Sequence, residues 1–137
     1  RWSLALLPDA QDLPQIIERL KSQQTNGGAL ALLAIDEEFF MIIRVLGSHI
    51  KLFLSDITCA IDYEIAAEFI ELCDLDMPEE DDEPFPAGDL DIISDIGVHR
   101  MELSTLCDDP DLFPDEQLEA IASRLGFGEE FTQLLEL

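Results

Sequence analysis

Three apolar segments separated by short polar turns dominate the first half of the chain. Residues 29–35 are almost wholly apolar, residues 39–46 are aromatic and β-branched, and residues 50–55 place alternate apolar side chains on one face. Turns as short as residues 36–38 and Gly47-Ser48 join neighbouring antiparallel strands. The pattern therefore predicts an antiparallel β-meander. Its inner strands are apolar on both faces, so we expect other elements to cover each face.

Helical spacing flanks this meander on both sides. Before it, Asp12 is the expected N-cap of a helix with Ile16, Ile17 and Leu20 on one face. Residues 4–7 are typical of the end of a further strand, and because the chain starts at Arg1 we expect the native N-terminus to lie upstream. After the meander, Ser55 or Asp56 is expected to cap one long helix. Its apolar stripe comprises Ile57, Ile61, Ile65, Phe69 and Leu72.

An acidic, proline-containing stretch then divides the chain. From Glu71 to Asp91 there are ten acidic residues and no basic ones. Self-repulsion and proline both oppose packing, which indicates a linker or an exposed loop. We therefore predict an α+β sheet domain at residues 1–72, an acidic linker at residues 73–88 and a C-terminal module at residues 89–137.

The C-terminal module has the pattern of short helices. The expected segments are Leu90–Ile96 after an Asp89 cap, His99–Cys107, a helix that follows Pro114 and ends at Gly126, and Glu129–Leu137. About fifty residues of short helix are marginal alone, so we expect the module to dock on the sheet or to be steadied by a partner. The predicted fold is α+β, with a meander of three to four strands flanked by helices and followed by a small helical module.

The charge balance limits the partners that the chain can bind. It carries 31 acidic and 7 basic residues, for a formal net charge of −24. Direct binding to nucleic acid or to anionic lipid is therefore disfavoured. Hydrophobic residues make up 47% of the chain, enough for a folded core. No apolar run reaches the length of about 20 residues that a membrane span needs.

The residues that carry most enzyme chemistry are not grouped in recognisable patterns. Cys59, Cys73 and Cys107 are odd in number and widely spaced, which favours a reducing cytoplasm over a disulfide framework. His49 and His99 have no second histidine at helical spacing. Positions counted from Asp74 fail the pattern of a calcium loop. We therefore predict no catalytic, metal-binding or cofactor-binding residues, no cofactor and no enzymatic activity.

The most informative feature is the acidic run, Glu79, Glu80, Asp81, Asp82 and Glu83. One interpretation is a solubilising linker. The other is an electrostatic attraction for a partner with a basic surface, which speeds encounter and selects among partners. On the second interpretation these five residues are the predicted partner-binding site.

Several segments, taken in order, carry a family resemblance. They are Ala31-Leu32-Leu33-Ala34-Ile35-Asp36-Glu37-Glu38-Phe39-Phe40, Phe53-Leu54-Ser55-Asp56, the acidic proline-containing stretch, Ala87-Gly88-Asp89-Leu90, Ile93-Ser94-Asp95-Ile96-Gly97-Val98 and Leu125-Gly126-Phe127-Gly128-Glu129-Glu130-Phe131. Together they resemble the actinobacterial tRNA adenosine deaminase-associated proteins. The resemblance implies a link to the tRNA adenosine deaminase but supplies no catalytic residues. The chain also lacks the deaminase's own zinc signature, H-x-E with P-C-x-x-C.

The resulting hypothesis is a non-catalytic, cytoplasmic interaction protein that accompanies or regulates adenosine-to-inosine editing of tRNA. Three alternatives stay open. The chain could be a polyanionic mimic of nucleic acid that blocks basic proteins, an enzyme with an unrecognised carboxylate site, or a self-assembling protein that pairs through an exposed edge strand. The sequence does not specify the oligomeric state.

Overall fold

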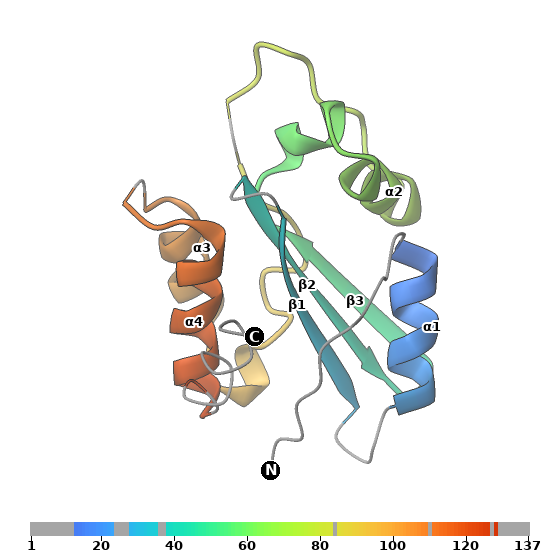
Figure 1. Cartoon of the computed structure of the whole chain (residues 1–137), viewed down its shortest axis with the longest axis vertical. Helices are drawn as coiled ribbons and strands as arrows, with labels where there is room; N and C mark the ends of the chain where they lie inside the picture. The colour runs from blue at the N-terminus through green and yellow to red at the C-terminus, as the bar shows by residue number, and fades with distance from the viewer. Residues whose placement is uncertain are drawn as a thin grey trace.

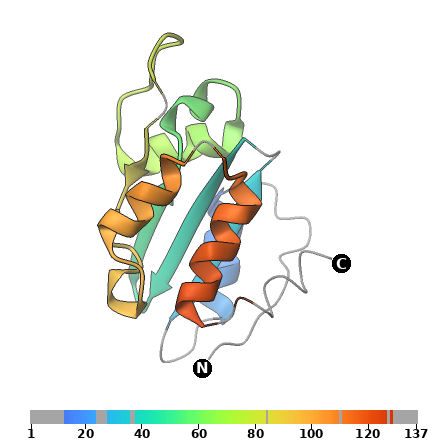
Figure 2. The ribbon, with the colours of Figure 1, turned by 90° about the vertical axis from the view of Figure 1, so that its left-hand side faces the viewer.

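A four-stranded antiparallel sheet lies between two helical layers (Figures 1 and 2). The computed structural model describes residues 13–23, 28–35, 38–83, 85–109, 111–126 and 128. The elements in order are α1 (Leu13–Gln23), β1 (Ala29–Ile35), β2 (Phe39–Leu46), β3 (His49–Leu54), the 3₁₀ helix η1 (Ile57–Ile61), α2 (Glu64–Cys73), β4 (Ala87–Gly88), η2 (Ser94–Ile96), α3 (Arg100–Cys107) and α4 (Pro114–Leu125). Helices α1 and α2 cover one face of the sheet, and α3 and α4 lie on the other (Figure 1). The predicted α+β class is confirmed.

The sheet has the order β1-β2-β3-β4, and its first three strands are the predicted meander. Ile43 of β2 lies opposite Ala31 of β1 and Leu52 of β3, so the hairpin register is regular. The fourth strand is β4, which pairs with Phe53 and Leu54. Its two residues belong to the segment that we expected to be linker. The strand expected at residues 4–7 and the Asp12 cap lie outside the described residues.

Strand β2 serves two hydrophobic cores at once. Its odd-numbered side chains Phe39, Met41, Ile43 and Val45 pack with α1 and α2, around Leu13, Ile16 and Phe69. Its even-numbered side chains Phe40 and Ile42 pack with the C-terminal helices, around Ile92, Leu118 and Ile121. This explains why the strand is apolar on both faces, and it confirms that both faces are covered. The C-terminal helices are docked on the sheet, whereas the division into three domains stays a prediction.

The single long helix expected from Ile57 to Leu72 is wrong, because the structure divides it into η1 and α2. Asp56 caps η1 as expected, and its carboxylate accepts the Thr58 backbone N–H at 2.9 Å. A 3₁₀ helix has 3.0 residues per turn, whereas an α-helix has 3.6. Apolar residues spaced for one continuous α-helix therefore do not share one face across the break. As a result Ile61 and Leu72, which the stripe placed in the core, are exposed.

The C-terminal segments follow the sequence expectations in part. Residues 90–93 form turns and only η2 is helical, so the expected helix at Leu90–Ile96 is mostly wrong. Gly126 ends α4 at φ 99°, as predicted, and Gly97 ends η2 at φ 135°. The segment Glu129–Leu137 lies outside the described residues. No helix in the described part of the chain is long and apolar enough to cross a membrane.

Candidate interaction surface

Residues 74–86, here called the acidic loop, connect α2 to β4 and project from the upper end of the molecule in Figure 1. Both ends of the loop are fixed to the folded core. At one end the Leu75 N–H donates to the Ile70 carbonyl at 3.0 Å, and Asp74 ends α2 in the left-handed conformation. At the other end the Phe85 carbonyl accepts the Ile57 N–H at 2.9 Å. The loop is therefore presented from a fixed base.

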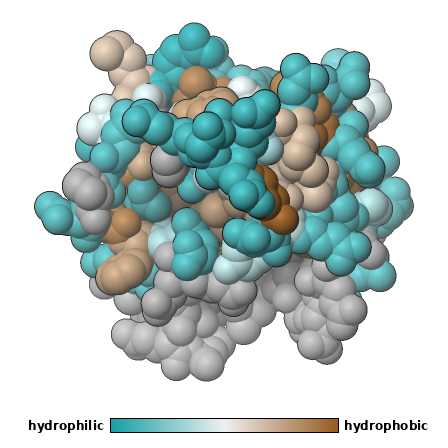
Figure 3. All heavy atoms as spheres, turned by 90° about the horizontal axis from the view of Figure 1, so that it is seen from above, coloured by the Kyte–Doolittle hydropathy of each residue, from teal (hydrophilic) through white to brown (hydrophobic). Residues whose placement is uncertain are grey.

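The acidic run forms an exposed turn within this loop. All five of its residues are exposed. The Asp82 carboxylate accepts the Glu79 backbone N–H at 2.8 Å, and the Asp82 N–H donates to the Glu79 carbonyl at 3.1 Å. Carboxylate oxygens of Glu79, Asp81 and Asp82 lie within 4.8 Å of one another. The structure thus brings together the carboxylates of three of the five sequence-predicted binding residues, and Glu80 and Glu83 are exposed beside them in the chain. The end of the molecule that carries this turn is largely hydrophilic in Figure 3, with hydrophobic residues visible between the hydrophilic ones.

The basic residues in the described part of the chain form no ion pair with this turn. Five ion pairs occur in the described residues: Lys21–Glu18, Arg44–Asp95, Lys51–Asp89, Arg100–Asp91 and Arg124–Glu102. None of these pairs includes a residue of the acidic loop, and three of them involve aspartates between residues 89 and 95. The negative charge of the loop is therefore available to an external cation.

Arg44 is a buried charge whose role the sequence did not reveal. Its side chain is 8% exposed on the face of β2 that points to the C-terminal helices. The guanidinium donates to the Ile92 carbonyl at 2.9 Å and to both carboxylate oxygens of Asp95, at 2.5 and 3.1 Å. The hydrogen bond from Arg44 holds the pKa of Asp95 below its usual value. This pair ties the central strand to η2. The available signal was that Arg44 is the one charged residue of an otherwise apolar strand.

The thiols and imidazoles form no reactive constellation within the described residues. Burial raises the pKa of Cys59 to about 12, with a further contribution from Asp56, and burial also raises the pKa of Cys107 to about 12. All three cysteines are free thiols. His49 and His99 are both exposed, at the start of β3 and just before α3. These thiols are protonated at neutral pH and are poor nucleophiles.

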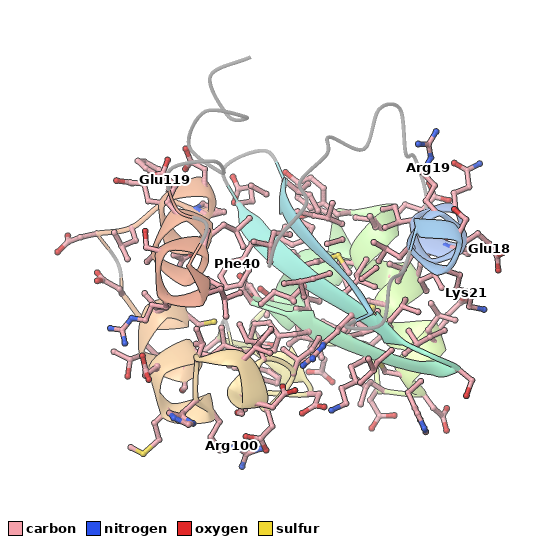
Figure 4. All side chains as sticks on the ribbon, turned by 90° about the horizontal axis from the view of Figure 1, so that it is seen from below. Glu18, Arg19, Lys21, Phe40, Arg100 and Glu119 are labelled. Carbon is pink, nitrogen blue, oxygen red and sulfur yellow. The ribbon has the colours of Figure 1, made fainter. Side chains whose placement is uncertain are left out.

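A shallow, open depression lies on the outer side of α1. Its lining residues are Pro14, Gln15, Glu18, Arg19 and Ser22. Glu18 and Arg19 point away from the sheet (Figure 4). The Ser22 hydroxyl donates to the Arg19 carbonyl at 2.8 Å, so it is not activated by a neighbouring base. The acidic loop is therefore the stronger candidate for function.

Comparison with known proteins gives the family. The profile of the family described as "Rv3753c-like tRNA adenosine deaminase-associated protein" matches residues 1–128. The chain belongs to this family. Among the tRNA adenosine deaminase-associated proteins, Protein Rv3753c of Mycobacterium tuberculosis (strain ATCC 25618 / H37Rv) is 41% identical to it over 120 residues, which cover 85% of this chain and 69% of that protein. No solved structure matches. The resemblance inferred from the sequence is confirmed.

Proposed function

We propose that this tRNA adenosine deaminase-associated protein is a non-catalytic partner of the tRNA adenosine deaminase and binds it through the acidic loop. The family description supports the identity of the partner. The observation that carries the proposal is the exposed acidic run, Glu79–Glu83, which no ion pair of the described residues reaches. In this proposal the two proteins associate in the cytoplasm.

The physical basis is charge complementarity with an enzyme that handles tRNA. Such an enzyme presents cations to the phosphate backbone of its substrate. A cluster of carboxylates on a projecting turn attracts the same cations, at a range of about 8 Å at physiological ionic strength. Binding there either competes with tRNA or stabilises the enzyme between substrates. Both outcomes regulate editing without any reaction on the part of the acidic protein.

The test is direct association of the two purified full-length proteins, measured at 50 and 300 mM NaCl. The charge variant carries Glu79→Gln, Glu80→Gln, Asp81→Asn, Asp82→Asn and Glu83→Gln. We expect its association rate to fall at least about tenfold at low salt, because it lacks the steering charge. The matched control neutralises five acids elsewhere: Glu18→Gln, Asp108→Asn, Asp111→Asn, Asp115→Asn and Glu119→Gln. It should stay within about twofold of wild type if the position of the charge matters.

Two results would overturn the proposal. One is no association of the wild-type proteins at low salt, and the other is an equal association rate for the charge variant and the wild type. Catalysis is tested in parallel by inosine formation in tRNA. We expect the protein to change the rate of the deaminase and to form no inosine when it is incubated with tRNA alone.

A further inference from the structure

The acidic loop and the helix end that leads into it expose apolar side chains as well as carboxylates. Nine large hydrophobic residues are exposed in the described part of the chain, and four of them lie between residues 72 and 85. These four, here called the apolar set, are Leu72 at 53%, Leu75 at 39%, Met77 at 55% and Phe85 at 48% exposed. Leu75 stands between Asp74 and Asp76, so charged and apolar groups alternate along the segment. A purely solubilising linker has no need of such side chains.

Three of the four residues of the apolar set, Leu72, Leu75 and Phe85, lie on anchored backbone. Leu72 lies in the last turn of α2, and the Leu75 N–H closes that helix on the Ile70 carbonyl. Phe85 is held through its carbonyl to η1. Two of the four positions thus have hydrogen-bonded backbone and a third lies in a helix. Groups held in this way lose less conformational entropy on binding than groups on a free chain.

We propose that the apolar set, bordered by the acidic run, is a docking surface for a protein that offers apolar sockets within a cationic rim. The proposal rests on the proposed function for the identity of that protein, the tRNA adenosine deaminase, and adds the mode of binding. Association is thus not electrostatic alone: the carboxylates steer the partner, and the apolar side chains hold it. Interfaces commonly divide these tasks between a charged rim and an apolar centre.

Charge complementarity selects a cationic protein over the other occupants of an apolar surface. A second copy of the chain would bring a further net charge of −24 and the same ten acids from Glu71 to Asp91. A membrane with anionic headgroups would repel the surface for the same reason. A basic protein surface is favoured by both contributions to binding, because its cations attract the acidic run and its apolar sockets bury the apolar set.

The two components differ in their dependence on salt, which makes the proposal testable. Attraction between exposed charges is screened by salt, whereas burial of apolar area is not. We therefore measure the Kd of the full-length chain for the deaminase at 50, 150 and 300 mM NaCl. The apolar variant is Met77→Ser with Phe85→Ser. The matched control is Met101→Ser with Phe113→Ser, the same residue types at positions that are 78% and 57% exposed outside the loop.

We expect the apolar variant to raise Kd at least about tenfold at every salt concentration, so that its salt plot runs parallel to that of wild type. The control pair should stay within about twofold of wild type. The charge variant Glu79→Gln, Glu80→Gln, Asp81→Asn, Asp82→Asn, Glu83→Gln should lose affinity at low salt and approach the wild type at high salt. Parallel displacement by one variant and convergence of the other is the signature of the proposed surface.

The outcomes separate the two proposals. If wild type binds and the apolar variant binds equally well, the docking surface is wrong and charge-driven capture survives. If wild type does not bind at any salt concentration, both proposals are wrong. Thermal melting checks the fold of the variants, and we expect a Tm close to that of wild type because both side chains are about half exposed. If the double variant has a lowered Tm, the single variants Met77→Ser and Leu72→Ser, at the two most exposed positions of the apolar set, provide the same comparison.

Discussion

The pair formed by Arg44 and Asp95 gives the sharpest test of how the two sides of the sheet are joined. Asp95→Ala removes two charge-assisted hydrogen bonds from a guanidinium whose remaining acceptor, among the described residues, is the Ile92 carbonyl. A hydrogen bond to a charged group contributes about 1.5–3 kcal/mol. The Asp95 side chain is 62% exposed, so water replaces part of the loss and we discount the cost to about 1–2 kcal/mol. For a domain of this size that lowers Tm by roughly 4–8 °C.

A double-mutant cycle isolates the interaction from the substitution itself. Arg44→Met removes the guanidinium and keeps an apolar side chain of comparable length at the buried position. In that background Asp95→Ala should cost less than about 0.5 kcal/mol, because the aspartate no longer has a cationic partner. Urea unfolding followed by circular dichroism measures each free energy, with the m-value checked for constancy. Glu18→Ala, which breaks the exposed pair with Lys21, is the control and should change stability by less than about 0.5 kcal/mol.

An equal cost of Asp95→Ala in both backgrounds, or no cost in the wild type, would contradict a stabilising pair between Arg44 and Asp95. Either result would mean that the buried guanidinium is satisfied without the aspartate. The link between β2 and η2 would then depend on apolar packing alone.

Three further predictions concern protonation and backbone geometry. Because Arg44 holds the pKa of Asp95 below its ordinary value of about 3.9, the stabilisation is present above that value and is lost as pH falls through the lower folded-state pKa. The difference in urea midpoint between wild type and Asp95→Asn should therefore shrink below about pH 4, and a constant difference would contradict the pairing. Cys59 and Cys107, with pKa values of about 12, should resist iodoacetamide in the native protein at pH 8 and react in urea, which mass spectrometry measures. Rapid labelling of the native protein would contradict these raised pKa values. Gly88→Ala should lower the free energy of unfolding by at least about 2 kcal/mol, because φ is +97° and the new Cβ would lie 2.3 Å from the Leu52 carbonyl oxygen. The control Gly47→Ala, with φ +64° and nothing within 4 Å, should cost only about 1 kcal/mol, and equal costs would show that the close approach at Gly88 is not limiting.

Local patterns were sufficient for the elements that are stabilised locally. The meander follows from alternation along residues 50–54 and from the turn at Gly47, whose φ is +64°. Strand β4 could not be predicted in the same way, because Ala87 and Gly88 have low β propensity and become a strand only by pairing with Phe53 and Leu54. Propensity says nothing about a partner so distant in the sequence.

The candidate site shows the same limit. Composition was enough to predict that Glu79–Glu83 would be exposed. It did not reveal that Phe85 is tied to η1, since that hydrogen bond joins segments that are far apart in the sequence. Helical spacing predicts a buried stripe that includes Leu72, because the pattern does not show the break between η1 and α2. The sequence does not show the role of Arg44, because its partner Asp95 lies 51 residues away.

The double use of β2 has a consequence for the newly synthesised chain. One face of the strand is covered by α1 and α2, which are close to it in sequence. The other face, with Phe40 and Ile42, packs against Leu118 and Ile121, which lie about 80 residues later in the sequence. Until α4 has been synthesised, the face of the sheet that carries Phe40 and Ile42 is incompletely covered. Exposed apolar surface of this kind favours aggregation. The ten acids of residues 71–91 are synthesised before α4, so we expect their mutual repulsion to oppose association of nascent chains during that interval.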